Sequence, residues 1–428
     1  MPTSETKPDR GIYHYLVVLT GIVCCFGPCA LALSCAGIFF PAVTASLDVS
    51  NAKFAAYLTI MLVVASLALP FLGKIMEKYD ARIVLSVAVL CIGLPLIAMS
   101  FSNAVWQFYI AGAIMGLGMA VLLVLTVPTL INRWYRKRVG FYIGLCMAFT
   151  GIGGVAFNPV GGHFINSGSE GWRTGYLVFG IIAIALALPF TLFAVHSRPS
   201  DVGMLPFGAN DAPEGKADLA SVKDTGITSA AALKLPVFYL FLVFVAISNI
   251  CINLYQYLPT YAKSLTQYPD VVEIAAALAS AAMLGQAIGK VLLGIINDRT
   301  NITAVVLTAT SCGIAGVAVI VFIPQYAWLV LVAGFLFGVF YANGTVLTPL
   351  MTRAMFGNLD YSGIYSKVAM VGTFAGAFAL TLWGLVVDLW GARTMLLVGL
   401  GLIALLLVLG LTILKASKKI EFQTAESQ

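Results

Sequence analysis

Two lysines stand inside stretches of this sequence that are apolar enough to cross a membrane. Lys290 lies in the run GQAIGKVLLG, four residues before Gly294, and Lys367 lies in DYSGIYSKVAMVG. A lysine at the centre of a membrane helix costs about 2.5–3.5 kcal/mol on insertion scales, so such a residue usually has a partner or a function. Two ammonium groups facing one cavity would attract an anion, and a carboxylate fits that chemistry.

The alternative for both lysines is that their long side chains reach back to the membrane surface. Lys290 is one helical turn, about 6 Å, from the expected inner end of its span. Lys367 lies near the start of its own span, which leaves the same alternative open. Recognition of a dicarboxylate would require both lysines to face the cavity.

Further polar side chains mark a possible cavity wall. Asn249, Asn253 and Gln256 recur at helical spacing and share one face of their span. The alternative for this stripe is hydrogen bonding between helices, worth about 1 kcal/mol or less for each residue. The full set of predicted substrate-binding residues is Lys290, Lys367, Tyr341, Asn253, Gln256, Gln286, Tyr365, Asn249 and Tyr255.

Acidic residues do not fall well inside any expected span. Glu273, Asp298 and Asp388 all lie at span ends or in loops. Proton relays in membranes normally use a buried Asp or Glu, so only His163 remains as a candidate relay, with a structural role as its alternative. Exchange of anions, or entry of an already protonated substrate, is therefore at least as well supported as a carboxylate relay.

Other chemistries find no support in the sequence. The eight cysteines all fall in apolar runs without metal-site spacing and are interpreted as small buried hydrophobic residues. No phosphate-binding loop or nucleophile elbow stands in a suitable context, so we predict no enzyme activity, no cofactor and no metal site. The net charge of +6 is dispersed, which argues against nucleic acid as a partner.

The elements that must position these residues are membrane helices. The chain is 60% hydrophobic and 10% charged, whereas soluble domains are near 45–50% apolar and about 25% charged. Windows of about 20 apolar residues predict twelve spans. They lie near 14–43, 54–73, 83–101, 105–131, 140–166, 174–195, 237–262, 272–295, 303–323, 327–351, 363–387 and 394–415.

A polar stretch, 197–234, separates the first six spans from the last six. We therefore predict an N-terminal six-helix bundle (1–196), a cytoplasmic linker (197–234) and a C-terminal six-helix bundle with a tail (235–428). With the N-terminus inside, eighteen Lys and Arg residues fall in inner segments, four in outer segments and two in helices. This asymmetry predicts that both termini are cytoplasmic.

The two halves also repeat one another at an offset of about 221 residues. The loop after the second span reads GKIMEKYDAR from Gly73, and the loop after the eighth reads GIINDRTN from Gly294. Each has a glycine, an acid four residues on, and then a base. A duplicated six-helix unit is typical of transporters whose site lies at the repeat interface near the membrane midplane.

These loops resemble the signature of the major facilitator superfamily, and the resemblance covers essentially the whole chain. It implies that the loops form a conformational latch, whereas the alternative is that they only set topology by positive charge. The implied latch residues are Gly73, Glu77, Lys78, Arg82, Gly294, Asp298 and Arg299. The first copy departs from the pattern, with Glu77 in place of Asp and Lys78 in place of Arg.

A narrower resemblance points to the branch of oxalate/formate antiporters and monocarboxylate transporters. NRWYRKRVGF from Asn132, GWR from Gly171 and RPSDVGMLP from Arg198 are similar to that branch. The resemblance implies that Lys290, at a position usually held by arginine, pairs with the substrate carboxylate, and that Lys367 matches a lysine of the oxalate/formate type. Proton-coupled members carry an acid one turn before this base, and here that position is Gln286.

The sequence is thus interpreted as an all-α membrane protein with twelve transmembrane helices in two pseudo-symmetric bundles. The predicted function is secondary active transport of a small organic anion, a mono- or dicarboxylate, by antiport or proton-linked symport. The alternatives are an exporter of amphipathic, drug-like compounds and a transporter-like sensor. We further predict a monomer in the plasma membrane, or the inner membrane of a bacterium, with lipids and either protons or a counter-anion as partners.

Overall fold

The computed structural model describes residues 11–49, 51–165, 167–168, 170–209, 225–418, 420 and 423–424. Residues 210–224 of the predicted linker therefore lie outside the described residues. So do Lys7, Arg10, Lys216, Lys223 and Lys419, which contributed to the orientation count. Within the described chain, 12 helices are long and apolar enough to cross a membrane, as predicted. The exact domain boundaries remain a prediction.

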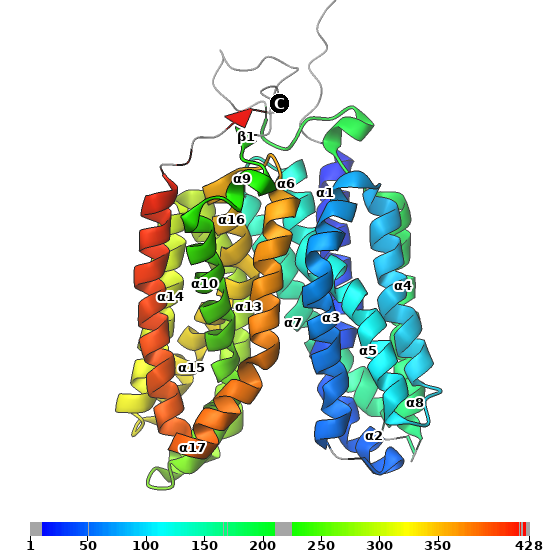
Figure 1. The fold of residues 1–428 in the computed structure, drawn as a ribbon. Helices are drawn as coiled ribbons and strands as arrows, with labels where there is room; N and C mark the ends of the chain where they lie inside the picture. Colours follow the sequence, from blue (N-terminus) through cyan, green and yellow to red (C-terminus); the bar gives the residue numbers. More distant parts are fainter. Residues whose placement is uncertain are drawn as a thin grey trace, which may run out of the picture.

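The first six spans form one group of helices (Figure 1). Three of them, the first, fourth and sixth, contain π-helical segments. In chain order the elements are α1 (Ile12–Cys24), η1 (Cys25–Ser34), η2 (Ala36–Phe39), α2 (Phe40–Leu47), α3 (Asn51–Lys78), α4 (Ala81–Met99), α5 (Val105–Met119), η3 (Ala120–Thr126), α6 (Val127–Trp134), α7 (Val139–Ile165), α8 (Gly171–Pro189) and η4 (Phe190–Ala194).

The last six spans form the second group. They follow the short segments η5 (Pro199–Val202), β1 (Thr225–Gly226) and α9 (Ser229–Ala232). Their elements are α10 (Pro236–Ile252), η6 (Asn253–Tyr257), α11 (Leu258–Ser264), α12 (Pro269–Glu273), α13 (Ala275–Arg299), α14 (Ile302–Phe322), α15 (Ala327–Tyr341), η7 (Asn343–Leu347), α16 (Thr348–Phe356) and α17 (Tyr361–Ser417), followed by strand β2 (Gln423–Thr424).

The internal repeat is visible in where the spans are interrupted. In the fourth span, the π-helix η3 ends two residues before Pro128, and in the tenth span the π-helix η7 ends two residues before Pro349. A proline has no N–H to donate and its ring clashes with the carbonyl four residues earlier, so the preceding turn widens. The two prolines are 221 residues apart, which is the offset that the loop motifs predict.

Local sequence also fixes where several spans begin and turn. Asp80 accepts a hydrogen bond from the backbone N–H of Arg82 at the start of α4, and Asn301 does the same for Ala304 at the start of α14. The long helix α17 contains two spans, and the chain reverses at Gly391. Its φ of 85° and ψ of 161° are open essentially to glycine alone.

The two groups of six stand side by side and meet unevenly. We call the end at which α1 begins and α17 finishes the terminal end, and the opposite one the far end. In Figure 1 the ribbons of the two groups approach each other most closely near the terminal end, at the top, and diverge toward the far end. Both described chain ends thus lie on one side, and which side of the membrane this is remains a prediction.

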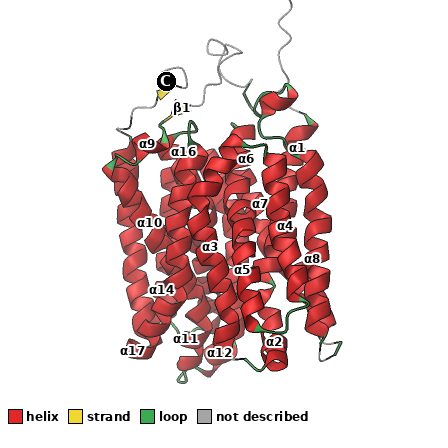
Figure 2. Cartoon of the chain, turned by 45° about the vertical axis from the view of Figure 1, so that its right-hand side comes forward, coloured by secondary structure: helices red, strands yellow, loops and turns green. Residues whose placement is uncertain are grey.

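The described parts of the linker and the tail cover the terminal end (Figure 2). Strand β1 pairs with β2 in an antiparallel two-stranded ribbon. The backbone N–H of Ile227 donates to the Phe356 carbonyl oxygen at 3.0 Å, and Asn358 N–H donates to the Thr225 carbonyl oxygen at 2.9 Å. These bonds fasten the end of the linker to the loop between α16 and α17.

Candidate functional site

The two halves touch most tightly where α7 crosses α13. A Cβ atom placed on Gly140 would lie only 2.5 Å from the carbonyl oxygen of Gly294, and one on Gly294 would lie closer still to that of Gly140. One turn further along α7, a Cβ on Gly144 would overlap the Lys290 carbonyl oxygen. Only glycine allows backbones to approach this closely. These contacts close the passage between the halves at the terminal end.

A second close crossing brings α3 against α17. A Cβ on Gly73 would meet the Ser366 side-chain oxygen at 2.5 Å and the Ser362 carbonyl oxygen at 2.9 Å. Nearer the middle of α3, the Ser66 hydroxyl donates to the Met370 carbonyl oxygen at 3.3 Å. The predicted latch glycines Gly73 and Gly294 therefore both lie in contacts between the halves.

Beyond these crossings the same helix faces lose their partners. On α7, a Cβ on Gly151 would have no atom within 4 Å, and Val155, one turn further, is 77% exposed. On α13, Met283 lies two turns before Lys290 on the same face and is 41% exposed. The faces that seal the terminal end thus separate toward the far end, so the structure is closed on one side and open on the other.

Lys290 lies at the point where this packing stops. Lys290 is 3% exposed. Its Nζ atom donates to the Met147 carbonyl oxygen at 3.4 Å and to the Thr150 hydroxyl at 3.3 Å. Its backbone is level with Gly144, and its side chain extends about one turn along α7 toward the far end, where it meets Met147 and Thr150. The ammonium group therefore points into the membrane interior and does not reach back to the terminal surface.

A polar wall continues from Lys290 toward the far end. Gln286 precedes Lys290 by one turn on α13 and shares a side-chain hydrogen bond with Tyr341. The ring of Tyr341 packs edge-on against that of Tyr255, with centroids 5.1 Å apart. Three of the nine predicted substrate-binding residues are thereby joined in one chain of contacts that leads from α13 through α15 to η6 and begins one turn from Lys290.

Lys367 is placed differently. Its Nζ atom donates to the hydroxyl of Ser229 in α9 and, at 2.9 Å, to the Gly363 carbonyl oxygen. Helical side chains lean toward the N-terminus of their helix. Because α17 begins at the terminal end, Lys367 leans toward that surface, whereas α13 begins at the far end and directs Lys290 inward. The structure does not bring the two lysines onto a common partner.

The remaining predicted substrate-binding residues contact other parts of the structure than Lys290 does. Asn249 and Asn253 donate to the carbonyl oxygens of Val245 and Asn249, one turn earlier in their own span. Asn249 lies beside Gly372 and Gly376 of α17, and Asn253 lies beside Gly376. Gln256 is exposed, and Tyr365 is buried against Tyr361 with ring centroids 5.4 Å apart. The amide stripe thus serves the packing of spans seven and eleven in this conformation.

Asp298 forms the one carboxylate bridge between the halves that is seen among the described residues. Its two oxygens accept hydrogen bonds from the backbone N–H groups of Gly140, at 2.8 Å, and Phe141, at 2.7 Å. These groups open helix α7, whose N-terminus carries a partial positive charge. A carboxylate from the second half therefore caps a helix of the first half, as a latch requires.

We expect Asp298→Ala to shift the protein away from this conformation. Hydrogen bonds to a charged group contribute about 1.5–3 kcal/mol, roughly a tenfold to hundredfold change in the equilibrium. The reporter is a cysteine placed at exposed Val155, whose labelling by an impermeant maleimide measures opening at the far end. Labelling should fall in Asp298→Ala and fall less in Asp298→Asn, which keeps one acceptor oxygen. Equal labelling in all three proteins would contradict the latch.

The first copy of the loop motif does not form the same bridge. Glu77 pairs with Arg133 of its own half at 3.1 Å. Asp360 stands at the N-cap position of α17 without a side-chain cap hydrogen bond, and its carboxylate accepts from Ser229 N–H at 2.7 Å. Burial raises the pKa of Asp360, and the Ser229 N–H and nearby Lys367 oppose that rise. Lys78 and Arg299 are both exposed. The two copies of the loop motif therefore make different contacts.

Arg82, the last predicted latch residue, is also occupied within the first half. Its guanidinium donates to the Val195 carbonyl oxygen at 2.9 Å and contacts the ring of His196. Burial and the charge of Arg82 lower the pKa of His196 below its ordinary value of 6.5, while Asp201 and Asp80 nearby oppose the shift. The folded protein therefore favours the neutral ring, which accepts a hydrogen bond from Arg82.

This arrangement predicts a loss of stability in acid. As the pH falls through about 6.5, the unfolded chain protonates His196 more readily than the folded protein does, so the free energy of unfolding decreases. We expect melting temperatures measured between pH 8 and pH 5 to decline less in His196→Gln, whose amide still accepts from Arg82. Parallel pH curves for the two proteins would contradict this role.

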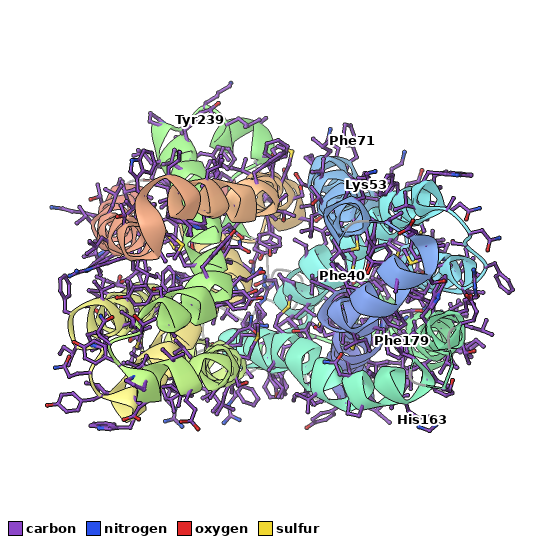
Figure 3. All side chains as sticks on the ribbon, turned by 90° about the horizontal axis from the view of Figure 1, so that it is seen from below. Phe40, Lys53, Phe71, His163, Phe179 and Tyr239 are labelled. Atoms are coloured by element: carbon purple, nitrogen blue, oxygen red, sulfur yellow. The ribbon has the colours of Figure 1, made fainter. Side chains whose placement is uncertain are left out.

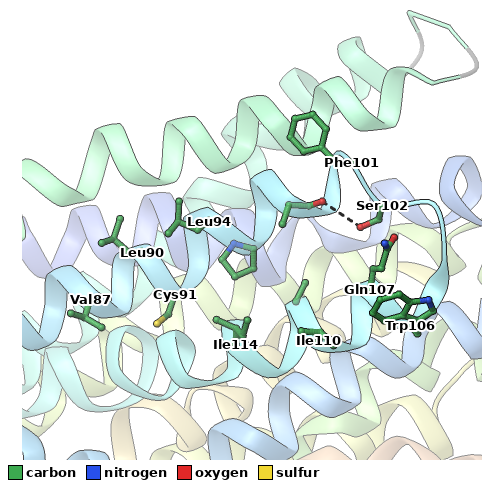
Figure 4. Close-up of a pocket in the computed structure, with 13 residues that line it drawn as sticks. Val87, Leu90, Cys91, Leu94, Phe101, Ser102, Trp106, Gln107, Ile110 and Ile114 are labelled. Atoms are coloured by element: carbon green, nitrogen blue, oxygen red, sulfur yellow. Dashed lines mark hydrogen bonds between the residues drawn. The ribbon is translucent and has the colours of Figure 1, made fainter.

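Two other features lie away from the central site. His163, the candidate proton relay, is exposed at the outer edge of the first half (Figure 3). An apolar hollow of about 540 Å³ runs between α4 and α5 on the outside of the bundle (Figure 4). Its walls include Leu94, Ile110 and Trp106, each more than half exposed. A lipid-facing hollow without charged lining residues does not suit an anion.

Sequence reasoning missed the partners contributed by the opposite half. Thr150 and the Met147 carbonyl oxygen hold Lys290, yet neither position is distinguished by any local pattern. The span pattern marks Asp360 only as a boundary, whereas in the structure this residue holds the N-cap position of α17 and accepts a hydrogen bond from Ser229 N–H. The signal that could have identified it is a carboxylate directly before an expected helix start.

Comparisons with known proteins identify the family of this chain. The sequence profile described as Major Facilitator Superfamily matches residues 22–377. Monocarboxylate transporter 1 of Homo sapiens is 31% identical over 204 residues, which cover 47% of this chain and 40% of that protein. The chain thus matches less than half the length of this relative.

Two solved structures share the fold across nearly the whole chain. The proton:xylose symporter XylE superposes with a TM-score of 0.70 at 12% identity, covering 94% of this chain and 96% of that one. The human organic anion transporter MFSD10 gives a TM-score of 0.67 at 15% identity, covering 92% and 99%. With the profile match, the twelve spans and the duplicated halves, the chain belongs to the Major Facilitator Superfamily.

Proposed function

We propose that this protein is a secondary transporter of small organic anions that carry one carboxylate group. The observation that carries the proposal is the buried ammonium group of Lys290, held at the point where the contacts between the halves stop. A buried cation in this position would pair with an anion that enters from the open end. The relatives named monocarboxylate transporters support the same substrate class.

The proposal assigns the carboxylate to Lys290 and the rest of the substrate to its neighbours. Gln286 and Tyr341 offer an amide and a hydroxyl beside the ammonium group, and Tyr255 adds an aromatic edge. An ammonium is a point charge that accepts a carboxylate from several directions, unlike the planar fork of arginine. With Lys367 bonded to α9, a single positive charge favours a monocarboxylate over a dicarboxylate.

Alternating access would follow from the contacts that differ between the two ends. The glycine crossings and the Asp298 cap would break as the terminal end opens, and new contacts would form at the far end. Such a transition moves the two groups of six as bodies around a site near the midplane. Lys290 belongs to one half and its partners Met147 and Thr150 to the other, so a substrate that replaces these partners couples binding to the motion.

Uptake into proteoliposomes tests the proposal. Purified protein should accumulate labelled lactate, pyruvate or formate, and should transport the corresponding uncharged amides at least tenfold more slowly. Preloading the vesicles with the unlabelled acid should accelerate entry if the protein exchanges anions, whereas an inward proton gradient should accelerate it if protons accompany the substrate. Equal transport of acids and amides, or transport of lipophilic cations alone, would refute the carboxylate assignment.

A further inference from the structure

Thr150 on α7 is one of the two partners of Lys290, and it is the more accessible of them. Met147 is 2% exposed, whereas Thr150 is only partly buried and directly precedes Gly151, where a Cβ would have no atom within 4 Å. Along α7, Thr150 also lies nearer the far end than Met147 does. A ligand that enters from the open end to reach Lys290 therefore meets the Thr150 hydroxyl before the Met147 carbonyl oxygen.

The hydrogen bonds of this hydroxyl determine what it can bind. Its Oγ1 atom donates to the Met147 carbonyl oxygen at 2.8 Å and accepts from Lys290 Nζ at 3.3 Å. A hydroxyl has one hydrogen to donate and two lone pairs that accept. Because the hydrogen of Thr150 is directed to Met147, Thr150 acts toward Lys290 as an acceptor.

Contacts with the first span hold Thr150 in this position. Ser34, the last residue of η1, donates its hydroxyl to the Thr150 carbonyl oxygen at 3.1 Å. One turn further along α7, a Cβ on Gly154 would lie 2.9 Å from the Ser34 Cβ atom, so the two segments are closely packed. Both segments belong to the first half, whereas Lys290 belongs to the second. The hydroxyl is thus fixed in one half and the ammonium group in the other.

A carboxylate that pairs with Lys290 removes a donor from Thr150. The ammonium group that turns to the carboxylate gives up its long contacts with neutral oxygens, and a buried acceptor that loses its donor is unfavourable unless another replaces it. A hydroxyl of the substrate itself can be that donor. In a 2-hydroxy acid, two carbon atoms separate the hydroxyl from the carboxylate oxygens, which suits binding groups that lie 3.3 Å apart, Lys290 Nζ and Thr150 Oγ1.

We propose that Thr150 is a specificity-determining residue, which accepts a hydrogen bond from the 2-hydroxyl group of the carried acid while Lys290 binds its carboxylate. This rests on the carboxylate function proposed above and narrows the substrates to 2-hydroxy monocarboxylates such as lactate. An unsubstituted acid leaves Thr150 without a donor. A 2-oxo acid offers only an acceptor, so Thr150 would have to release the Met147 carbonyl oxygen to bind it.

The test compares acids that differ at one position. Apparent affinities are measured from the melting temperature of the purified protein in detergent, at fixed pH and with ionic strength held constant with sodium chloride. The acids are lactate, propionate without the hydroxyl, pyruvate with a 2-oxo group, and 3-hydroxypropionate with the hydroxyl one carbon further away. We expect the wild-type protein to bind lactate about tenfold or more tightly than each of the other three, the effect of one buried hydrogen bond.

Three variants assign the preference to Thr150. Thr150→Val removes the hydroxyl at nearly constant shape and should bring the affinities for lactate and propionate within about twofold of each other, because any disturbance of Lys290 affects both acids alike. Thr150→Ser keeps the hydroxyl and should retain the preference. Thr310→Val, in α14, is the matched control and should keep the wild-type ratio. It also removes a buried hydroxyl that donates within its own helix, to the Val306 carbonyl oxygen at 2.6 Å.

The outcomes separate this proposal from the carboxylate function. Equal affinity for lactate and propionate in the wild-type protein would overturn the role of Thr150, and this comparison stands even if Thr150→Val does not fold. A lactate preference that survives in Thr150→Val, or that is lost to the same extent in Thr310→Val, would also overturn it. If no acid stabilises the wild-type protein, or if acids and amides stabilise it equally, both proposals fail.

Discussion

Substituting glutamine for Lys290 is expected to lower carboxylate transport by about a hundredfold while leaving the protein folded. Removing one partner of a buried, hydrogen-bonded charge pair costs about 2–5 kcal/mol, roughly 30-fold to several thousandfold in binding. Without substrate, the partners of the ammonium group among the described residues are Met147 and Thr150, both neutral. Its removal relieves a buried charge, so the melting temperature of the substrate-free protein should stay the same or rise.

Two further variants make the Lys290 prediction specific. Lys290→Arg keeps the charge and should retain a substantial part of the uptake into proteoliposomes. Lys367→Gln removes the other lysine, which is bonded to Ser229 and Gly363, and should reduce uptake by less than tenfold. If Lys367→Gln were as inactive as Lys290→Gln, both lysines would have to face the substrate, and the assignment of one carboxylate to Lys290 alone would fail.

The second large effect is expected from a single methyl group at the terminal crossing. In Gly140→Ala the new Cβ would lie 2.5 Å from the Gly294 carbonyl oxygen and 3.1 Å from the Asp298 carboxylate. Helices α7 and α13 would have to separate, because the first of these contacts is a backbone atom of a packed helix. We expect the conformation closed at the terminal end to be depleted by at least tenfold and transport to be lost.

Helix α7 itself supplies the control. Gly151 lies three turns further along the same helix, and a Cβ there would meet no atom within 4 Å. Gly151→Ala should therefore keep transport, with a slight gain in stability because alanine favours the helix by up to about 1 kcal/mol over glycine. Maleimide labelling of the Val155→Cys reporter should fall when Gly140→Ala is added and remain high with Gly151→Ala. Unchanged labelling in Gly140→Ala would show that the crossing does not control opening.

The spans and the repeat could be predicted from the sequence because they depend on local patterns. Apolar runs of about 20 residues determine the twelve crossings, and Pro128 and Pro349 interrupt two of them at equivalent places. The turn at Gly391 follows from a conformation that few other residues adopt. These features need no knowledge of which helix lies beside which.

The orientation of the two lysines can be predicted from the sequence, but only if the direction of each helix is considered together with the position of the residue in it. Position alone leaves both residues with the same two alternatives, a cavity or the membrane surface. The direction of each span decides between them, because helical side chains lean toward the helix start. Lys290 leans toward the midplane from a helix that begins at the far end, and Lys367 leans toward the terminal end.

The latch shows what a local motif cannot predict. Its two copies have nearly the same residues, yet Asp298 bridges the halves whereas Glu77 pairs with Arg133 beside it. At the start of α17 the N-cap position is held by Asp360, a residue of the same half. Contacts between residues more than a hundred positions apart depend on how the two halves pack against each other. The spacing of residues within one loop does not predict that packing.

The measurement that tests the account most directly is the melting temperature of the purified protein with matched acids and amides. Lactate, pyruvate and formate are compared with the corresponding amides, for wild type and for Lys290→Gln. A ligand that binds the folded state raises the melting temperature by mass action. The account predicts that at least one acid stabilises the wild-type protein, that its amide does not, and that Lys290→Gln loses the effect. Equal stabilisation by acid and amide, or an unchanged response in Lys290→Gln, would contradict it.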